Sequence, residues 1–111
     1  MSTDRDLLYL SRADVEGLGL TAVETVDQIE HLCRERDAGR VLNAPKSLLR
    51  PVDEVLFMTT LAVSEDPPYT AVKALGVNAA NAHQGMDTIG STITLFDRAT
   101  AYPVAVMDGS W

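Results

Sequence analysis

The hydrophobic pattern of this chain changes its period once, at Pro45, and this change constrains the fold more than any other feature. Before Pro45, apolar residues recur every three or four positions, which is typical of amphipathic helices. After Pro45 they alternate or form runs of strand length, and the end of the chain reads strand, turn, strand. Helices followed by a series of strands predict an α+β fold.

Two helices are expected in the first part of the chain. Ser11 can cap a short one, directly after an apolar run that predicts a first strand at 7–10. Thr21 and Glu24 form a capping box, so a longer helix should begin there and run to about Ala38, with Gly39 as its C-cap. Its core-facing stripe is expected to consist of Val23, Val26, Ile29, Leu32 and Cys33, with Cys33 as a buried structural thiol. Its solvated face is expected to carry Glu24, Asp27, Glu30, Glu35 and Arg36.

The second part of the chain predicts a mostly antiparallel, open-barrel-like sheet with the helices packed on it. The expected strands are Lys46–Arg50, Glu54–Val63, Tyr69–Val77, Ser91–Asp97 and Tyr102–Met107. The polar segment Asn78–Gly90 reads as a long irregular loop near a site. The last strand has no obvious cover, so an exposed apolar sheet edge and self-association are expected. Residues 1–111 are expected to form one domain.

Composition excludes several classes of function. The net charge of −7 argues against a nucleic-acid partner and against an anionic membrane surface. No apolar run approaches the roughly 20 residues that span a bilayer, and the polar N-terminus is unlike a signal peptide. The single cysteine cannot form an internal disulfide. These features predict a soluble, cytoplasmic protein.

Lys73 is the sharpest candidate for a functional residue. Side chains alternate along a strand, so Lys73 should share one face with Ala71, Leu75 and Val77. An ammonium on an apolar row is costly unless it meets an anion, which makes Lys73 a candidate carboxylate ligand. A lysine that snorkels to water at a sheet margin explains the same pattern, and spacing alone does not choose between the two.

Other polar residues carry weaker signals. Lys46 and Arg50 share a strand face and could hold an acid together, although the pattern favours exposure to water. Thr88 lies just before a strand, where threonine is usually a turn residue. His31 lacks an acidic or cysteine partner at metal spacing. His83 has Asp87 four residues later, which is not a recognised metal or acid–base pair, so His83 is interpreted as a loop residue. The chain has no glycine-rich dinucleotide motif, phosphate-binding loop, zinc signature or nucleophile elbow, so we assign no catalytic, cofactor-binding or metal residue.

A set of motifs is spread over the chain: Pro45-Lys46, Met58, Val72-Lys73-Ala74 and Leu95-Phe96-Asp97-x-x-Thr100-x-Tyr102-Pro103-x-Ala105-x-Met107-Asp108-Gly109. Together these motifs resemble the N-terminal part of the ornithine cyclodeaminase/mu-crystallin family. The resemblance implies the substrate-binding and dimerisation domain of a homodimeric enzyme that exchanges hydride at the α-carbon of an amino or imino acid. It also implies that Lys46, Lys73 and Thr88 bind the substrate carboxylate. The NAD or NADP of a full-length relative would bind a following Rossmann domain, which this chain lacks.

Three departures from the family pattern affect these expectations. Ala101 stands at a turn position where the family has glycine, so strain is expected there. Leu56 stands where ornithine-specific members have glutamate, which disfavours a basic substrate side chain. The chain stops before the family's next carboxylate-binding arginine, so it reads as a truncated form that is inactive alone. A stand-alone, non-enzymatic module for dimerisation or for binding a small acid is the alternative.

Overall fold

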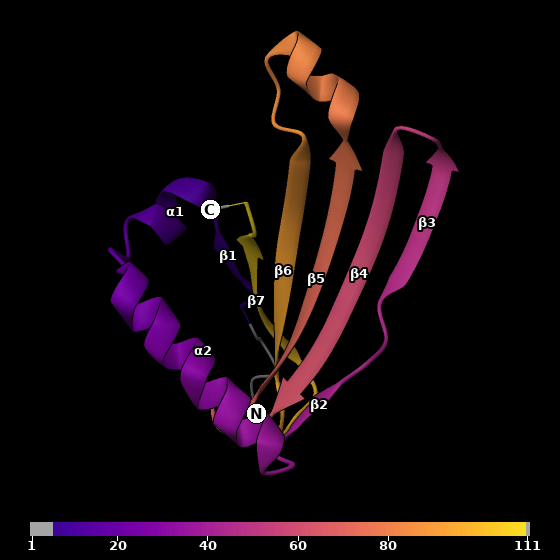
Figure 1. Ribbon diagram of the computed structural model, residues 1–111. Helices are drawn as coiled ribbons and strands as arrows, with labels where there is room; N and C mark the ends of the chain where they lie inside the picture. Colours follow the sequence, from indigo (N-terminus) through magenta and orange to yellow (C-terminus); the bar gives the residue numbers. More distant parts are fainter. Residues whose placement is uncertain (1–5, 111) are drawn as a thin grey trace.

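The computed structural model describes residues 6–110 and is an α+β structure (Figure 1). Its elements follow the chain as β1 (Leu8–Leu10), α1 (Arg12–Glu16), α2 (Ala22–Asp37), β2 (Val41–Asn43), β3 (Ser47–Val52), β4 (Val55–Ser64), β5 (Tyr69–Asn78), η1 (Ala79–Gln84), β6 (Ile89–Asp97) and β7 (Pro103–Asp108). The predicted helices and the five predicted long strands are confirmed, with ends that shift by up to two residues. The sequence pattern missed β2, and η1 is a 3₁₀ helix within the segment predicted as an irregular loop.

All seven strands belong to one open sheet with the order β1-β7-β6-β5-β4-β2, and β3 also pairs with β4. The long strands β4, β5 and β6 form continuous antiparallel ladders, whereas β1 pairs with β7 in parallel. The interpretation of the last strand as an exposed edge is therefore wrong, because β1 covers it. The free edges of the described sheet are β1 on one side and β2 with β3 on the other.

The two predicted helix caps form as the sequence indicates. Thr21 Oγ1 accepts a hydrogen bond from Glu24 N at 3.1 Å, and Glu24 Oε2 accepts one from Thr21 N at 2.9 Å. Ser11 and Asp14 make the same reciprocal pair at the start of α1. Gly39 follows α2 with a φ of 81°, the left-handed conformation expected after a helix.

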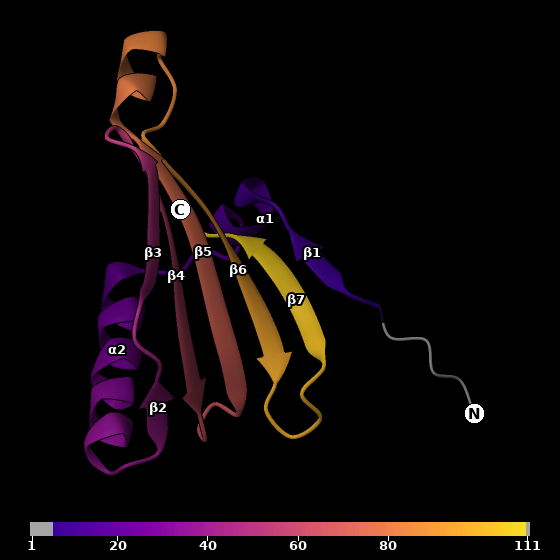
Figure 2. The ribbon, with the colours of Figure 1, turned by 90° about the vertical axis from the view of Figure 1, so that its right-hand side faces the viewer.

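The α-helices lie on one side of the curved sheet, and α2 crosses it near the lower ends of the strands (Figures 1 and 2). The helix does not close onto the strands along its length. Val23, Val26 and Ile29 remain 71%, 60% and 56% exposed, and Cys33 is exposed too. The predictions of a buried stripe and of a buried Cys33 thiol are wrong, and a cavity rather than packed side chains lies beneath Ile29, Leu32 and Cys33.

Glu35 is buried, although it was predicted on the solvated face of the helix. The guanidinium of Arg40 donates to both of its carboxylate oxygens, with Nε–Oε2 at 2.5 Å and Nη2–Oε1 at 2.9 Å. These hydrogen bonds lower the pKa of Glu35 below its ordinary value and raise that of Arg40. The pair fixes the end of α2 next to β2, and thereby sets the position of the helix over the sheet.

The turn between β6 and β7 contains backbone strain. Ala101 has a φ of 61°, which confirms the expectation for a position that favours glycine. We expect Ala101→Gly to raise the free energy of unfolding by about 0.5–1 kcal/mol, since the relief of left-handed strain exceeds the entropy that glycine adds to the unfolded chain. Urea denaturation measures the difference. Ala99→Gly in the same turn, where φ is not positive, is the control and should not stabilise; an Ala101→Gly variant no more stable than the parent would contradict this account.

Candidate functional site

Two of the predicted site residues line one cavity in the described structure. The cavity has a volume of about 350 Å³ and lies between the sheet and the end of α2. Its lining residues include Lys46, Lys73 and Arg36, together with Thr60 and Ile93. It falls within the range of small-ligand sites in proteins.

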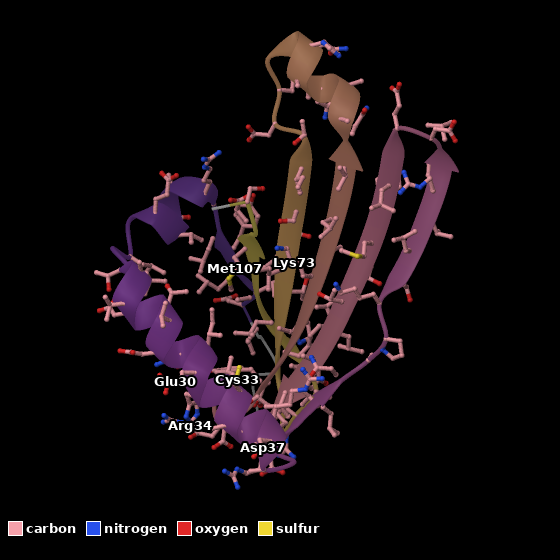
Figure 3. All side chains as sticks on the ribbon, viewed as in Figure 1. Glu30, Cys33, Arg34, Asp37, Lys73 and Met107 are labelled. Carbon is pink, nitrogen blue, oxygen red and sulfur yellow. The ribbon has the colours of Figure 1, made fainter. Side chains whose placement is uncertain are left out.

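Lys73 reaches the cavity because of its place in the ladder. It lies in the middle of β5, directly opposite Thr60 of β4 and Ile93 of β6, and its side chain is half-buried (Figure 3). Ala62 and Ala71 form the next rung toward α2, and their small side chains leave the space open. The alternation inferred from the sequence is therefore correct, and Lys73 stands on the face that α2 overhangs.

Lys46 enters the cavity because the sheet edge is interrupted beside it. β2 pairs with the last residues of β4 and β3 with its first residues, so 44–46 bridge the gap between them. Ala44 N donates to Leu61 O at 3.0 Å, whereas Pro45 has no N–H to offer to the ladder. The next residue, Ser47, pairs with Thr59, and this register places Lys46 beside Thr60. Since Thr60 pairs with Lys73, the Cα atoms of Lys46 and Lys73 are about two strand spacings apart, which is roughly 10 Å.

Arg36 is a candidate that the sequence interpretation missed. It was predicted on the solvated face of α2, but it lines this cavity and an adjoining apolar cavity. Its spacing carried a signal: Arg36 follows Ile29 by two helical turns and so falls on the same side of the helix. Figure 3 shows Cys33 on the side of α2 that faces the strands and Arg34 on the outer side.

The structure does not bring the other two polar candidates into this cavity. Thr88 lies just before β6, where its carbonyl accepts a hydrogen bond from Asn78 N at 2.8 Å. Thr88 is five positions before Ile93, the partner of Lys73, and five positions correspond to about 16 Å along a strand. Arg50 donates to the carbonyl of Asp53 at 2.8 Å within the β3–β4 hairpin. A role for Thr88 in binding carboxylate stays a prediction.

An apolar cavity of about 360 Å³ lies beneath α2, next to the cavity that Arg36, Lys46 and Lys73 line. The two share Arg36, Asn43, Ala62 and Ala71 as lining residues. The remaining walls of the apolar cavity include Ile29, Leu32, Cys33, Val41, Tyr69 and Leu95. The arrangement provides cationic groups at one end and apolar surface at the other, which suits a small molecule with an anionic head.

The described residues do not fit a dinucleotide or a metal ion. Helix N-termini bind pyrophosphate through free N–H groups, but Asp14 and Glu24 place carboxylates at the starts of α1 and α2 and hydrogen-bond the capping N–H groups themselves. Within residues 6–110, no group of three or more His, Cys, Asp and Glu side chains is placed to hold a metal. No helix of that range is long and apolar enough to cross a membrane.

Comparison with protein families gives one match over nearly the whole chain. The model of the ornithine cyclodeaminase/mu-crystallin family matches residues 5–111. A search among curated proteins gave no match.

Several solved structures share this fold. The Δ1-pyrroline-2-carboxylate reductase of Thermococcus litoralis, in complex with NADH and L-proline, is 25% identical, with a TM-score of 0.88 over 94% of this chain and 32% of that one. An archaeal alanine dehydrogenase dimer with bound NAD is 24% identical, with a TM-score of 0.85 over 94% of this chain and 31% of its own. The iminosuccinate reductase of Paracoccus denitrificans in complex with NAD⁺ is 21% identical, with a TM-score of 0.85 over 96% of this chain and 33% of that one. This chain spans about a third of the length of these proteins.

Proposed function

This chain belongs to the ornithine cyclodeaminase/mu-crystallin family, and on that premise we propose that it binds the carboxylate of a small amino or imino acid between Lys46 and Lys73. In this proposal residues 1–111 are the substrate-binding and dimerisation part of an NAD(P)-dependent amino-acid or imino-acid oxidoreductase or cyclodeaminase. Hydride transfer requires a cofactor-binding part that these residues do not contain. Alone, the chain binds substrate and does not turn it over.

The unpaired charge of the two lysines carries this proposal. Lys46 and Lys73 line the same cavity, and neither has a carboxylate partner among the described residues. Lys73 is half-buried, and a lysine whose ammonium group is partly removed from water is stabilised by a neighbouring anion. A carboxylate between the two ammonium groups supplies charge-assisted hydrogen bonds to both and fixes the position of the α-carbon.

The charges around the cavity also restrict the substrate. The three basic side chains, Arg36, Lys46 and Lys73, would repel a second amino group. Leu56 lies on β4 opposite Val77, on the same face as the cavity, and offers no carboxylate to a basic side chain. We therefore propose that the substrate is not a diamino acid such as ornithine or lysine.

Ligand-dependent thermal unfolding tests the binding half of the proposal, and a turnover assay tests the rest. L-Alanine, L-proline and Δ1-pyrroline-2-carboxylate should raise the Tm, because a ligand at ten times its Kd stabilises the folded state by about 1.4 kcal/mol. The corresponding amino-acid amides, which lack the carboxylate, should not. No NADH or NADPH should be consumed with the imino acid. Turnover by the pure 111-residue chain would contradict the need for a cofactor-binding part, and equal shifts with acids and amides would contradict carboxylate binding.

A non-enzymatic module that binds a small acid is the second candidate, favoured by the capped and acidic helix N-termini. Both candidates predict carboxylate binding, so ligand binding does not separate them. The DNA sequence that follows codon 111 distinguishes the two candidates. A continuation that encodes a glycine-rich strand–turn–helix motif supports the oxidoreductase, and a stop codon found there also in close relatives supports the module.

We further propose that the chain forms a homodimer through the β3 edge and the face of the sheet turned away from α2. Three large apolar side chains on that face, Leu49, Phe57 and Leu61, are 75%, 54% and 44% exposed. β3 pairs only with β4, so its outer backbone groups are free for a second strand. One of the similar solved structures, the alanine dehydrogenase, is described as a dimer.

A further inference from the structure

We infer that the cavity lined by Lys46 and Lys73 selects an amino or imino dicarboxylate as its substrate. Arg36 is the residue that recognises the second carboxylate. The inference rests on the proposed function, since it extends the carboxylate site formed by Lys46 and Lys73. It assigns a specificity role to a residue of α2 that lies outside the family motifs.

The distribution of unpaired bases supports this inference. The chain has nine lysine and arginine residues, of which Arg5 lies outside the described range. Five of the others bind acceptors of the chain itself: Arg12 to Glu16 and Asp87, Arg34 to Glu30, Arg40 to Glu35, Arg50 to the carbonyl of Asp53, and Arg98 to Glu65. The remaining three, Arg36, Lys46 and Lys73, all line one cavity, and no described acidic residue lines it.

This concentration of charge is unexpected in a chain with a net charge of −7. A monocarboxylic amino acid such as L-alanine carries one carboxylate and one ammonium group, so it brings no net charge to the three bases. A second carboxylate gives an amino dicarboxylate a net charge of −1, which offsets part of the repulsion among the bases. Arg36 and Lys46 are exposed and Lys73 is half-buried, so solvent screens part of that repulsion. The site is therefore electrostatically better matched to a dicarboxylate than to a zwitterionic monocarboxylate.

The positions of the three bases fit such a ligand. Lys46 and Lys73 line the cavity from the sheet, whereas Arg36 lines it from the last turn of α2. A ligand held by its α-carboxylate at the lysines would present its side chain toward the helix. Arginine is suited to that end, because its planar guanidinium binds a carboxylate through two parallel hydrogen bonds.

A favourable interaction with the helix dipole also accounts for an arginine in the last turn of α2. That explanation needs no ligand and predicts no preference between substrates. The measurement must therefore compare ligands that differ only in the charge of the side chain.

Isothermal titration calorimetry with isosteric pairs makes this comparison. We expect the 111-residue chain to bind L-aspartate at least 10-fold more tightly than L-asparagine, or L-glutamate at least 10-fold more tightly than L-glutamine. In Arg36→Gln the ratio of the Kd for the amide to the Kd for the acid should fall to about one, and Arg36→Lys should retain part of the preference. Arg34→Gln, which changes an arginine on the outer side of the same helix, should keep the full preference. Circular dichroism confirms that each variant is folded.

Each outcome decides the inference. Equal binding of acid and amide would overturn it while L-alanine binding still supports the proposed function. A preference that survives in Arg36→Gln would overturn the role of Arg36. If the chain binds none of the five amino acids, both the inference and the proposed carboxylate site are wrong.

Discussion

Replacing Lys73 with methionine is expected to weaken the binding of an amino-acid carboxylate by about 10- to 100-fold without destabilising the fold. A hydrogen bond to a charged group contributes about 1.5–3 kcal/mol, and each 1.4 kcal/mol corresponds to a factor of ten in Kd. Methionine fits the row that Lys73 occupies, between Thr60 and Ile93, and it leaves no unpaired charge there. Calorimetric titration measures the Kd, and urea denaturation measures the stability.

Two variants serve as controls for this prediction. Arg98→Gln removes a positive charge from the turn after β6, where Arg98 lies 3.7 Å from Glu65 and outside the cavity, so binding should not change. Lys73→Arg keeps the charge on a longer side chain and should lose less affinity than Lys73→Met. If Lys73→Met binds as tightly as the parent chain, Lys73 is a snorkelling residue and the proposed site is wrong.

Phe57→Glu is expected to convert the proposed homodimer to monomer at micromolar concentration, with a rise in the dimer Kd of about 30-fold or more. An aromatic residue at the centre of an interface contributes about 2 kcal/mol or more, and two carboxylates brought together across a twofold axis would add repulsion. Phe57 is 54% exposed in the single chain and lies opposite Gly76, on the open face of the sheet. Sedimentation velocity measures the mass against the 12.0 kDa of one chain.

Leu18→Glu is the matched control for the dimer prediction, since it also replaces an exposed apolar side chain by a carboxylate. Leu18 is 62% exposed and lies between α1 and α2, away from the proposed interface. This variant should sediment like the parent chain. A parent chain that is already monomeric at high concentration would contradict the proposed dimer, and so would a Phe57→Glu variant that remains dimeric.

Local signals in the sequence predicted the local structure well. The capping box of Thr21 and Glu24 fixed the start of α2, because its hydrogen bonds connect residues only three positions apart. Strand alternation placed Lys73 on the correct face for the same reason: it depends on the neighbours of Lys73 alone. The strained turn at Ala101 was also visible, since a single backbone conformation decides it.

Features that depend on distant parts of the chain were missed. The parallel pairing of β1 with β7 joins the two ends of the described chain, and no local pattern reports it. An amphipathic stripe shows which side of a helix tends to be buried, but not whether anything fills the space opposite, and so Val23 and Cys33 were wrongly expected in a core. Glu35 is buried because Arg40, beyond the end of the helix, folds back onto it.

The sequence predicted only part of the candidate site, because the rest depends on how distant segments pack together. Lys46 and Lys73 were identified from the family resemblance and from strand alternation, and the structure places both in one cavity. Arg36 was missed because its contribution depends on how α2 lies across the sheet, which no periodicity defines. Thr88 was carried over from the resemblance and does not line the cavity in this structure.

The most direct test of a carboxylate site between two lysines uses the fact that Lys46 and Lys73 are the only lysines in the chain. Selective ¹³C labelling of the lysine ε-carbons therefore gives two NMR signals, which Lys73→Arg assigns by removing one of them. On titration with the amino acid that stabilises the fold most, we expect both signals to shift along one saturating curve with a shared Kd, and neither to shift with its amide. If both lysine signals stay in place while the acid still raises the Tm, the ligand binds elsewhere and the account is wrong.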